Sequence, residues 1–368
     1  MALAQAQEAT ADSTSTKAAK DILLMLYPAP RKTAWEESVL KQHGDKLEIR
    51  WATTQAADGR YLKPADQDPA IFKDVTIYFS YLPAPAELVP KLKFVQTSSA
   101  GTDLWHDHPK YQDKNVVFCT SSGTQAPQIA EWVLGTWLRH RNDFPRYEEL
   151  QTQGVWKPVL PDEFIADSIG ARVGILGYGA IGRQVARACS AFGMQVLAFT
   201  STPRLTPESR RDRAYCVPGL GDPEGLLPAQ WFHGTTKHEL NSFLAQGLDM
   251  LVISLPLTPA THQYISRDQL DVLSEHKTFV VNVARGPIVD TEALMQALEE
   301  GKIRGAALDV TDPEPLPQGH PLWKARNCFV TPHVSYHSTT QQKRVLDLLA
   351  LNLDRFFSGR QLVNELKR

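Results

Sequence analysis

The sequence predicts an α/β protein with two doubly wound parallel sheets. Short apolar runs alternate with helix-like stretches along most of the chain, which favours parallel strands joined by crossover helices. A glycine-rich turn at 177–182 lies between one such run and a helix, as at the start of a dinucleotide-binding unit. The length of 368 residues fits two domains.

The first α/β unit follows a polar start. The opening twenty residues have neither a long apolar core nor an arginine, so we expect a loose polar tail without a targeting signal. A helix is expected at 33–44. The expected strands are 21–27, 47–52, 75–80, 93–99 and 115–120.

A long helix is expected near 127–143, where Ile129, Val133 and Trp137 recur at helical spacing. Bulky aromatic side chains on one helix suit a junction between domains or between subunits. An ordinary core helix explains the same pattern, and the sequence leaves both interpretations open.

The second α/β unit begins at residue 171. Residues 203–236 interrupt the alternation of strands and helices. They are rich in proline, glycine and arginine, which predicts an irregular insertion or lid. The chain ends in an amphipathic helix at 339–357. The further strands expected are 249–257, 278–285, 305–310 and 328–333.

Composition argues against several classes of protein. The chain has 39 Lys+Arg and 41 Asp+Glu residues, which leaves a net charge of −2. It contains no basic block of the kind that binds nucleic acid, so we expect no nucleic-acid partner. No apolar run reaches the roughly 18 residues of a membrane span. The four cysteines form no CxxC motif, which predicts reduced thiols in a cytoplasmic protein and no metal site.

The glycine loop predicts a dinucleotide site. Gly177, Gly179 and Gly182 follow the strand ARVGILG and open the helix AIGRQVARACSAF. Gly177 permits a tight turn, Gly179 admits a pyrophosphate, and Gly182 allows helix and strand to pack closely. Free N–H groups at the helix start, around Ala180 and Ile181, favour the phosphates. A glycine-rich turn without a ligand is the alternative.

The end of the next strand predicts which dinucleotide binds. An acidic residue there would accept hydrogen bonds from the ribose 2′-OH of NAD, but this chain has Thr200. Ser201, Thr202 and Arg204 follow, and a guanidinium can bind a 2′-phosphate. We therefore expect NADP(H) to be preferred, with NAD(H) possible. The alternative is that Arg204 is a solvated loop arginine.

Three polar side chains follow three successive strands of the second unit. Arg285 follows VVNVA, Glu314 lies in LDVTDPEPLP and His333 lies in VTPHVS. The carboxyl ends of parallel strands open onto one crevice, so the three can converge there. Each also has an ordinary explanation. Arg285 can cap a helix or pair with Asp309, Glu314 can be a solvated turn residue, and His333 can be a core histidine.

Five segments occur in a specific order: GYGAIG, SLPLTPATHQYI, NVARGPIVDTEAL, GAALDVTDPEPLP and TPHVS. Together they resemble the D-2-hydroxyacid dehydrogenase family, and within it members of the glyoxylate/hydroxypyruvate reductase kind. The resemblance covers nearly all of 90–360. It implies two Rossmann-like domains and NADPH-dependent reduction of a small 2-oxo acid to a D-2-hydroxy acid.

The resemblance implies roles for the three polar residues. Arg285 would bind the substrate carboxylate, His333 would act as the general acid in reduction, and Glu314 would orient His333. The backbone N–H groups of Ala100 and Gly101, in TSSAGTDLW, would hold the same carboxylate.

Further positions follow from the same matching. Tyr81 lies in a loop that would line the substrate pocket. Asp309 matches an acid near the nicotinamide amide. Besides the glycine loop and residues 200–204, the positions expected to contact the cofactor are Pro256, Thr261, Val283, Ala284, Arg285, Asp309 and His333.

The family pattern implies that the cofactor domain is inserted into a flavodoxin-like substrate domain. We expect residues 1–125 and 337–368 to form the substrate domain and 126–336 the NAD(P)-binding domain. A homodimer built around the helix near 127–143 is also expected.

Two rival functions remain. Formate dehydrogenase shares the scaffold, but it pairs its histidine with glutamine where this chain has Glu314. A dinucleotide-sensing binding protein, like the related transcriptional corepressors, can keep all three polar residues and turn over slowly.

Overall fold

The computed structural model describes residues 19–28, 30–56, 58, 60–160 and 165–368. The expected polar tail falls almost entirely outside the described residues. The chain divides into two compact units. One holds the described residues up to Val95 together with His108–Val117, and the other holds Gln96–Asp107 and Phe118–Arg368.

The first sheet has five strands in the order β2-β1-β3-β4-β5. β1 (Asp21–Tyr27) pairs in parallel with β2 (Leu47–Thr53) and with β3 (Ile77–Ser80), and α1 (Thr33–His43) connects β1 to β2. This order is flavodoxin-like. The two outer strands are β4 (Phe94–Thr97) and β5 (Val117–Cys119).

The second sheet has seven strands in the order β12-β11-β10-β9-β6-β7-β8, and neighbouring strands pair in parallel. The order reverses between β6 and β9, which makes this position the topological switch point where ligands bind in such folds. Both sheets confirm the predicted fold class. The strands are β6 (Arg172–Leu176), β7 (Gln195–Thr200), β8 (Gln230–His233), β9 (Met250–Ile253), β10 (Phe279–Asn282), β11 (Gly305–Leu308) and β12 (Cys328–Val330).

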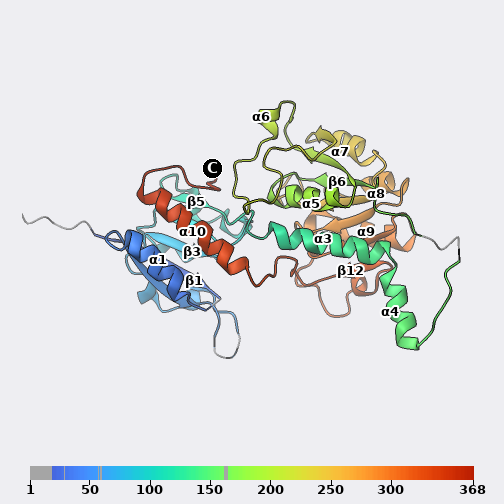
Figure 1. The fold of residues 1–368 in the computed structure, drawn as a ribbon. Helices are drawn as coiled ribbons and strands as arrows, with labels where there is room; N and C mark the ends of the chain where they lie inside the picture. Colours follow the sequence, from blue (N-terminus) through green and yellow to red (C-terminus); the bar gives the residue numbers. More distant parts are fainter. Residues whose placement is uncertain (1–18, 29, 57, 59, 161–164) are drawn as a thin grey trace, which may run out of the picture. The chain divides into compact units, whose positions relative to one another are not determined.

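Helices cover both faces of the seven-stranded sheet (Figure 1). On one face, α3 (Ala126–Arg141) and α5 (Ala180–Ala191) share a core with Val196 and Ala198 of β7. The other face carries α7 (Lys237–Leu244), α8 (Arg267–Ser274) and α9 (Thr291–Glu299), whose apolar residues meet Leu197 and Phe199. The alternation follows because successive strand residues point to opposite faces.

The aromatic residues of α3 belong to the core of their own unit. Trp137 is fully buried, and its indole N–H donates to the hydroxyl of Ser168 at 3.0 Å. The His140 ring stacks on Phe279 with ring centroids 4.4 Å apart. The sequence left open whether this helix forms a junction or an ordinary core helix. The side of α3 that carries Trp137 packs as a core helix.

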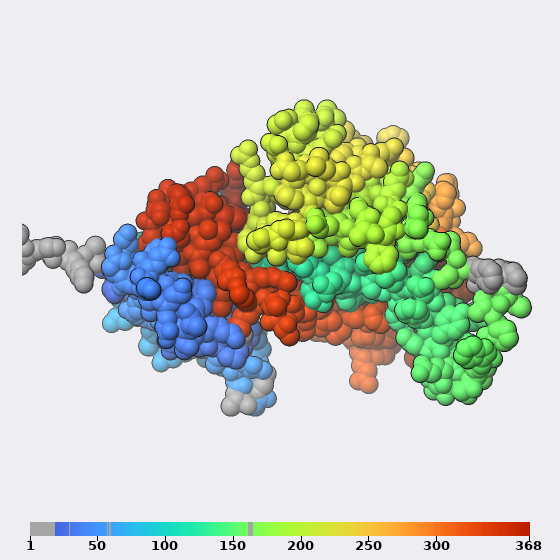
Figure 2. Space-filling view, in the orientation of Figure 1, coloured from blue at the N-terminus to red at the C-terminus, as the bar shows by residue number. Residues whose placement is uncertain are grey.

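The insertion is shorter than the irregular segment expected at 203–236. Residues 230–233 form the edge strand β8 beside β7, so the irregular part ends before it. Figure 2 shows this segment, in yellow-green and yellow, on the surface of the face that carries α5. The other helices are α2 (Pro109–Gln112), α4 (Phe144–Gln153), α6 (Pro207–Arg210) and α10 (Gln341–Phe357).

Candidate active site

The loop between β6 and α5 is shaped by its glycines. Gly177 has a φ of +100°, and a Cβ at this position would lie 2.9 Å from the backbone of Ser254. A Cβ on Gly182 would lie 2.4 Å from the carbonyl oxygen of Gly177, so a side chain there would push α5 away from β6. Around Gly179, in contrast, a Cβ would meet nothing within 4 Å.

The start of α5 fits a dinucleotide pyrophosphate. The helix begins at Ala180, and its N-cap residue Gly179 supplies no side-chain hydrogen bond. The first N–H groups of the helix, including that of Ile181, therefore lack intrahelical acceptors and can bind phosphate oxygens. Open space beside Gly179 leaves room for this approach.

The residues after β7 differ in their exposure. Thr200 is 9% exposed, and its hydroxyl donates to the carbonyl of Thr202 at 2.8 Å. Ser201 and Thr202 are exposed. Arg204 donates from Nη1 to the carbonyl of Ser209 at 2.5 Å, while its buried Nε has no hydrogen-bond partner among the described residues.

Three polar residues follow the adjacent strands β10, β11 and β12. The closest pair is Glu314 and His333, with Glu314 Oε1 2.7 Å from His333 Nδ1. Both side chains are more than one third exposed. The charge of Arg285 also acts on the carboxyl group of Glu314. The structure thus brings together all three residues singled out in the sequence.

The pKa of Glu314 lies below its usual value. The main cause is the hydrogen bond to His333, and the positive charge of Arg285 adds to it, while partial burial acts in the opposite direction. An ionised Glu314 accepts a hydrogen bond from Nδ1–H, which fixes the tautomer of the imidazole and leaves Nε2 to face a substrate.

A buried carboxylate shapes the loop that carries His333. Asp309 is 1% exposed, and its Oδ1 accepts hydrogen bonds from the hydroxyl of Thr331 at 2.6 Å and the N–H of Val334 at 2.8 Å. Its Oδ2 accepts from the N–H of Ser335 at 3.0 Å. His333 itself has a φ of +55°, a conformation that such bonds can hold. Sequence reasoning did not identify this positioning role of Asp309.

Arg285 is held by its own strand end. Asn282 is fully buried, and its side-chain amide donates to the carbonyl of Arg285 at 3.0 Å and accepts from the N–H of Ala284 at 3.0 Å. A Cβ on Gly286 would lie 1.9 Å from the carbonyl oxygen of Thr311. The glycine after Arg285 therefore lets this loop pack against the segment that leads to Glu314.

The guanidinium of Arg285 has a carboxylate partner that the sequence did not indicate. Its Nε and Nη2 donate to Oδ2 of Asp103 at 3.0 and 2.8 Å, while Nη1 donates to the carbonyl of Ala284 at 2.8 Å. The alternative partner considered from the sequence, Asp309, instead uses both carboxylate oxygens for residues 331–335.

Asp103 belongs to the same loop as the expected substrate-binding backbone. Within the described residues, the N–H groups of Ala100 and Gly101 donate no hydrogen bond. A Cβ on Gly101 would lie 2.1 Å from Nη2 of Arg285, so the guanidinium rests against this backbone. Trp105 is 1% exposed and packs edge-to-face on Phe118, which makes it a core residue.

The remaining expected positions are Pro256, Thr261, Val283, Ala284 and Tyr81. Thr261 donates from its hydroxyl to the carbonyl of Pro256 at 2.7 Å and so closes the loop after β9. Val283 and Ala284 are buried at the end of β10, with 7% and 5% exposure. Tyr81 belongs to the other compact unit and is 46% exposed.

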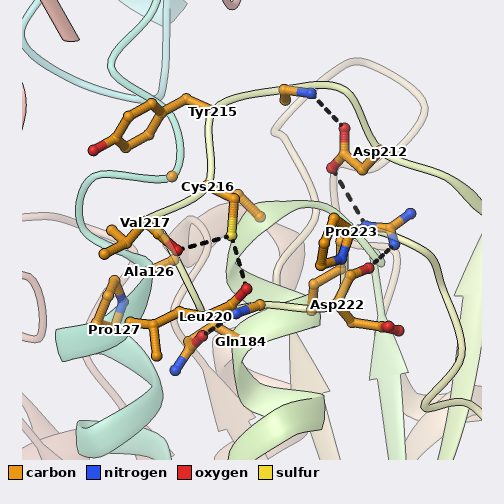
Figure 3. Close-up of a pocket in the computed structure, with 15 residues that line it drawn as sticks. Ala126, Pro127, Gln184, Asp212, Tyr215, Cys216, Val217, Leu220, Asp222 and Pro223 are labelled. Carbon is orange, nitrogen blue, oxygen red and sulfur yellow. Dashed lines mark hydrogen bonds and ion pairs between the residues drawn. The ribbon is translucent and has the colours of Figure 1, made fainter.

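A small pocket lies between α5, the start of α3 and the insertion (Figure 3). Ala180 lines it, whereas the three polar residues after β10, β11 and β12 do not. The buried Arg183 donates to the carbonyls of Asp222 and Arg210 and forms an ion pair with Asp212 at 3.3 Å. These bonds fix the insertion onto α5.

The described part of the chain has neither a metal-binding cluster nor a membrane-spanning helix. Among those residues, no group of His, Cys, Asp or Glu is arranged to hold a metal ion. No helix in the same residues is long and apolar enough to cross a membrane.

The chain matches one family model over more than half of its length. The model described as D-isomer specific 2-hydroxyacid dehydrogenase, NAD binding domain, matches residues 134–217 and 226–335. The interruption between the two matched segments falls inside the insertion.

Relatives and solved structures agree with this match. A human protein named glyoxylate reductase/hydroxypyruvate reductase is 35% identical over 282 residues, 75% of this chain and 77% of its own. A glyoxylate reductase of Thermofilum pendens is 30% identical over 275 residues, 74% of each chain. The crystal structure of a D-isomer specific 2-hydroxyacid dehydrogenase from Xanthobacter autotrophicus Py2, in complex with NADPH and MES, is 30% identical with a TM-score of 0.69, covering 95% of this chain and 98% of that one.

Proposed function

Because the chain belongs to the D-isomer specific 2-hydroxyacid dehydrogenase family, a family of oxidoreductases, we propose that it reduces a 2-oxo acid to a D-2-hydroxy acid with NADPH. The observation that carries the proposal is the 2.7 Å contact between Glu314 and Nδ1 of His333. It directs the other ring nitrogen toward a substrate beside Arg285.

His333 is the proposed general acid. In the reduction, the carbonyl carbon of the substrate gains a hydride and the carbonyl oxygen gains a proton from Nε2 of His333. When bound, the nicotinamide cofactor supplies the hydride. Glu314 keeps Nδ1 protonated and stabilises the charge that the imidazole carries before the proton leaves. In the reverse direction the same nitrogen takes the proton from the hydroxyl group.

Arg285 is the proposed anchor for the substrate carboxylate. Its guanidinium offers a planar pair of N–H donors, which matches a carboxylate better than a lysine would. The unsatisfied N–H groups of Ala100 and Gly101 lie on the loop against which this guanidinium rests. We propose that these donors bind the same carboxylate.

NADP(H) is the proposed cofactor, with NAD(H) as a possible second choice. No carboxylate stands at Thr200, and Arg204 follows four residues later with a guanidinium that can bind a 2′-phosphate. The Xanthobacter structure was solved with NADPH. In this proposal residues 126–336 form the cofactor domain, which also carries Arg285 and His333, while 1–125 and 337–368 form the substrate domain.

Small 2-oxo acids are the proposed substrates. The names of the human and Thermofilum relatives refer to glyoxylate and hydroxypyruvate. A decisive assay follows NADPH and NADH oxidation with glyoxylate, hydroxypyruvate, pyruvate, phenylpyruvate and 2-oxoisocaproate, and determines the chirality of every product except glycolate, which has no stereocentre. Turnover with NADPH to the D-product supports the proposal. Cofactor binding without turnover of any acid would favour a dinucleotide sensor instead.

A cytoplasmic homodimer completes the proposal. In α3, Trp137 is buried and Trp132 is partly buried within their own unit, but large apolar side chains are exposed just after this helix. Trp156 is 95% exposed, and Phe144 and Val155 are each 48% exposed. Apolar residues gathered at a surface mark an interaction site. We therefore place the dimer contact on α4 and the segment that follows, beside the helix first expected to form it.

A further inference from the structure

Asp103 occupies the face of Arg285 on which the proposed function places the substrate. Both Nε and Nη2 of the guanidinium donate to one oxygen of Asp103, at 3.0 and 2.8 Å. These are the two N–H groups that form a parallel pair on one edge of an arginine. The third engaged nitrogen, Nη1, already serves the carbonyl of Ala284. A substrate carboxylate that binds this edge of Arg285 must therefore displace the carboxylate of Asp103.

The contact is suited to exchange. The side chains of Arg285 and Asp103 are 28% and 40% exposed, so water screens the pair and its breakage costs little. Asp103 is the first residue of the 3₁₀ helix η4 (Asp103–Trp105), and the buried Trp105 fixes the other end of this short element. When Asp103 releases the guanidinium, its carboxylate must remain close to it.

We propose that Asp103 is a specificity-determining residue, which competes with the substrate carboxylate for Arg285 and selects 2-oxo acids that carry a single carboxylate. This inference rests on the proposed function. A monocarboxylate replaces Asp103 on the guanidinium, and the displaced Asp103 carboxylate remains nearby as a single unpaired negative charge. A substrate with a second carboxylate adds another negative charge near the displaced Asp103, and two like charges at short range repel.

The test measures kcat and KM with NADPH for glyoxylate, which has one carboxylate, and for 2-oxoglutarate and oxaloacetate, which have two. The variants are Asp103→Asn and Asp103→Ser. Asp107→Asn is the matched control, because Asp107 is exposed, lies in the same loop and makes the same change in net charge. NADPH binding and circular dichroism verify that each variant is folded.

Loss of the Asp103 charge is expected to lower KM for glyoxylate and to raise kcat/KM for the diacids about fivefold relative to glyoxylate. Asp107→Asn should change neither quantity. A rise in KM for all three acids with an unchanged ratio would show that Asp103 only positions Arg285, and unchanged values would show that it does not compete. Either result overturns the inference. If the wild-type enzyme reduces none of the acids, the proposed function itself fails.

Discussion

Oε1 of Glu314 lies 2.7 Å from Nδ1 of His333, and this bond links two loops that follow neighbouring strands. Glu314 can hold the imidazole of His333 in a single orientation because Asp309 fixes the loop that carries His333. Asp309 in turn is buried at the end of β11. The geometry of the proposed general acid thus depends on two carboxylates with different environments.

Replacement of His333 by alanine is expected to reduce kcat by about 10²–10⁴ while NADPH binding stays intact, because only proton transfer is lost. Steady-state kinetics and fluorescence titration with NADPH measure the two effects. His238→Ala is a suitable control, since His238 is an exposed residue of α7. Retained turnover in His333→Ala would remove this residue from the mechanism.

Glu314 should make stability depend on pH. Its pKa is lowered in the folded protein, mainly by the bond to His333, so the ionised form stabilises the fold above the unfolded pKa of about 4.3. This contribution is lost as pH falls through the lower folded-state pKa. Because the pair is partly exposed, the free energy should be below about 1 kcal/mol. Urea unfolding at pH 7 and in acid should show the gap between wild type and Glu314→Gln closing; a constant gap contradicts this.

Much of the fold follows from patterns within short segments. The apolar runs at 21–27, 249–257 and 278–285 each contain a strand, because parallel strands buried on both faces need continuous apolar side chains. The edge strand β8 was missed, since its sequence QWFH is short and directly follows the proline- and glycine-rich insertion.

The catalytic candidates were recognisable because each directly follows a predicted strand. Asp103 was not, because it lies 182 residues from Arg285 in the chain and no local pattern reports such a contact. Trp105, in the same loop as Asp103, is a core residue because it is buried against Phe118. Tertiary contacts of this kind follow from packing and leave little trace in the spacing of residues.

Cofactor preference should respond to Arg204. Arg204→Ala is expected to raise the KM for NADPH about tenfold more than that for NADH, because only NADPH carries the 2′-phosphate that a guanidinium can bind. Arg213→Ala, which changes an exposed arginine of the same insertion, is the control. Equal effects on both cofactors would place the 2′-phosphate elsewhere.

A second test of cofactor preference introduces an acidic residue at the end of β7. Thr200→Asp should move the preference toward NADH, since a carboxylate accepts hydrogen bonds from the 2′-OH and repels the phosphate. Thr200 is nearly buried and bonded to Thr202, so Ser201→Asp at the exposed neighbour is a useful companion variant. An unchanged ratio of kcat/KM for the two cofactors in both variants would refute the assignment.

The oligomeric state should depend on Trp156. A charge at this 95% exposed position, as in Trp156→Asp, is expected to convert a dimer to monomers in sedimentation velocity. Leu226→Asp changes another exposed apolar residue, 77% exposed and located in the insertion, and should leave the dimer intact. A wild-type monomer, or a Trp156→Asp dimer of unchanged affinity, would contradict the proposed interface.

The most direct test compares the rates of NADPH oxidation by the wild-type protein with glyoxylate and with its methyl ester. The acid and the ester carry the same aldehyde group, but only the acid offers a carboxylate to Arg285. The proposed function predicts rapid turnover of glyoxylate and a kcat/KM about 10² lower for the ester, as expected for loss of a charge-assisted pair. No turnover of glyoxylate, or equal rates with both compounds, would contradict it.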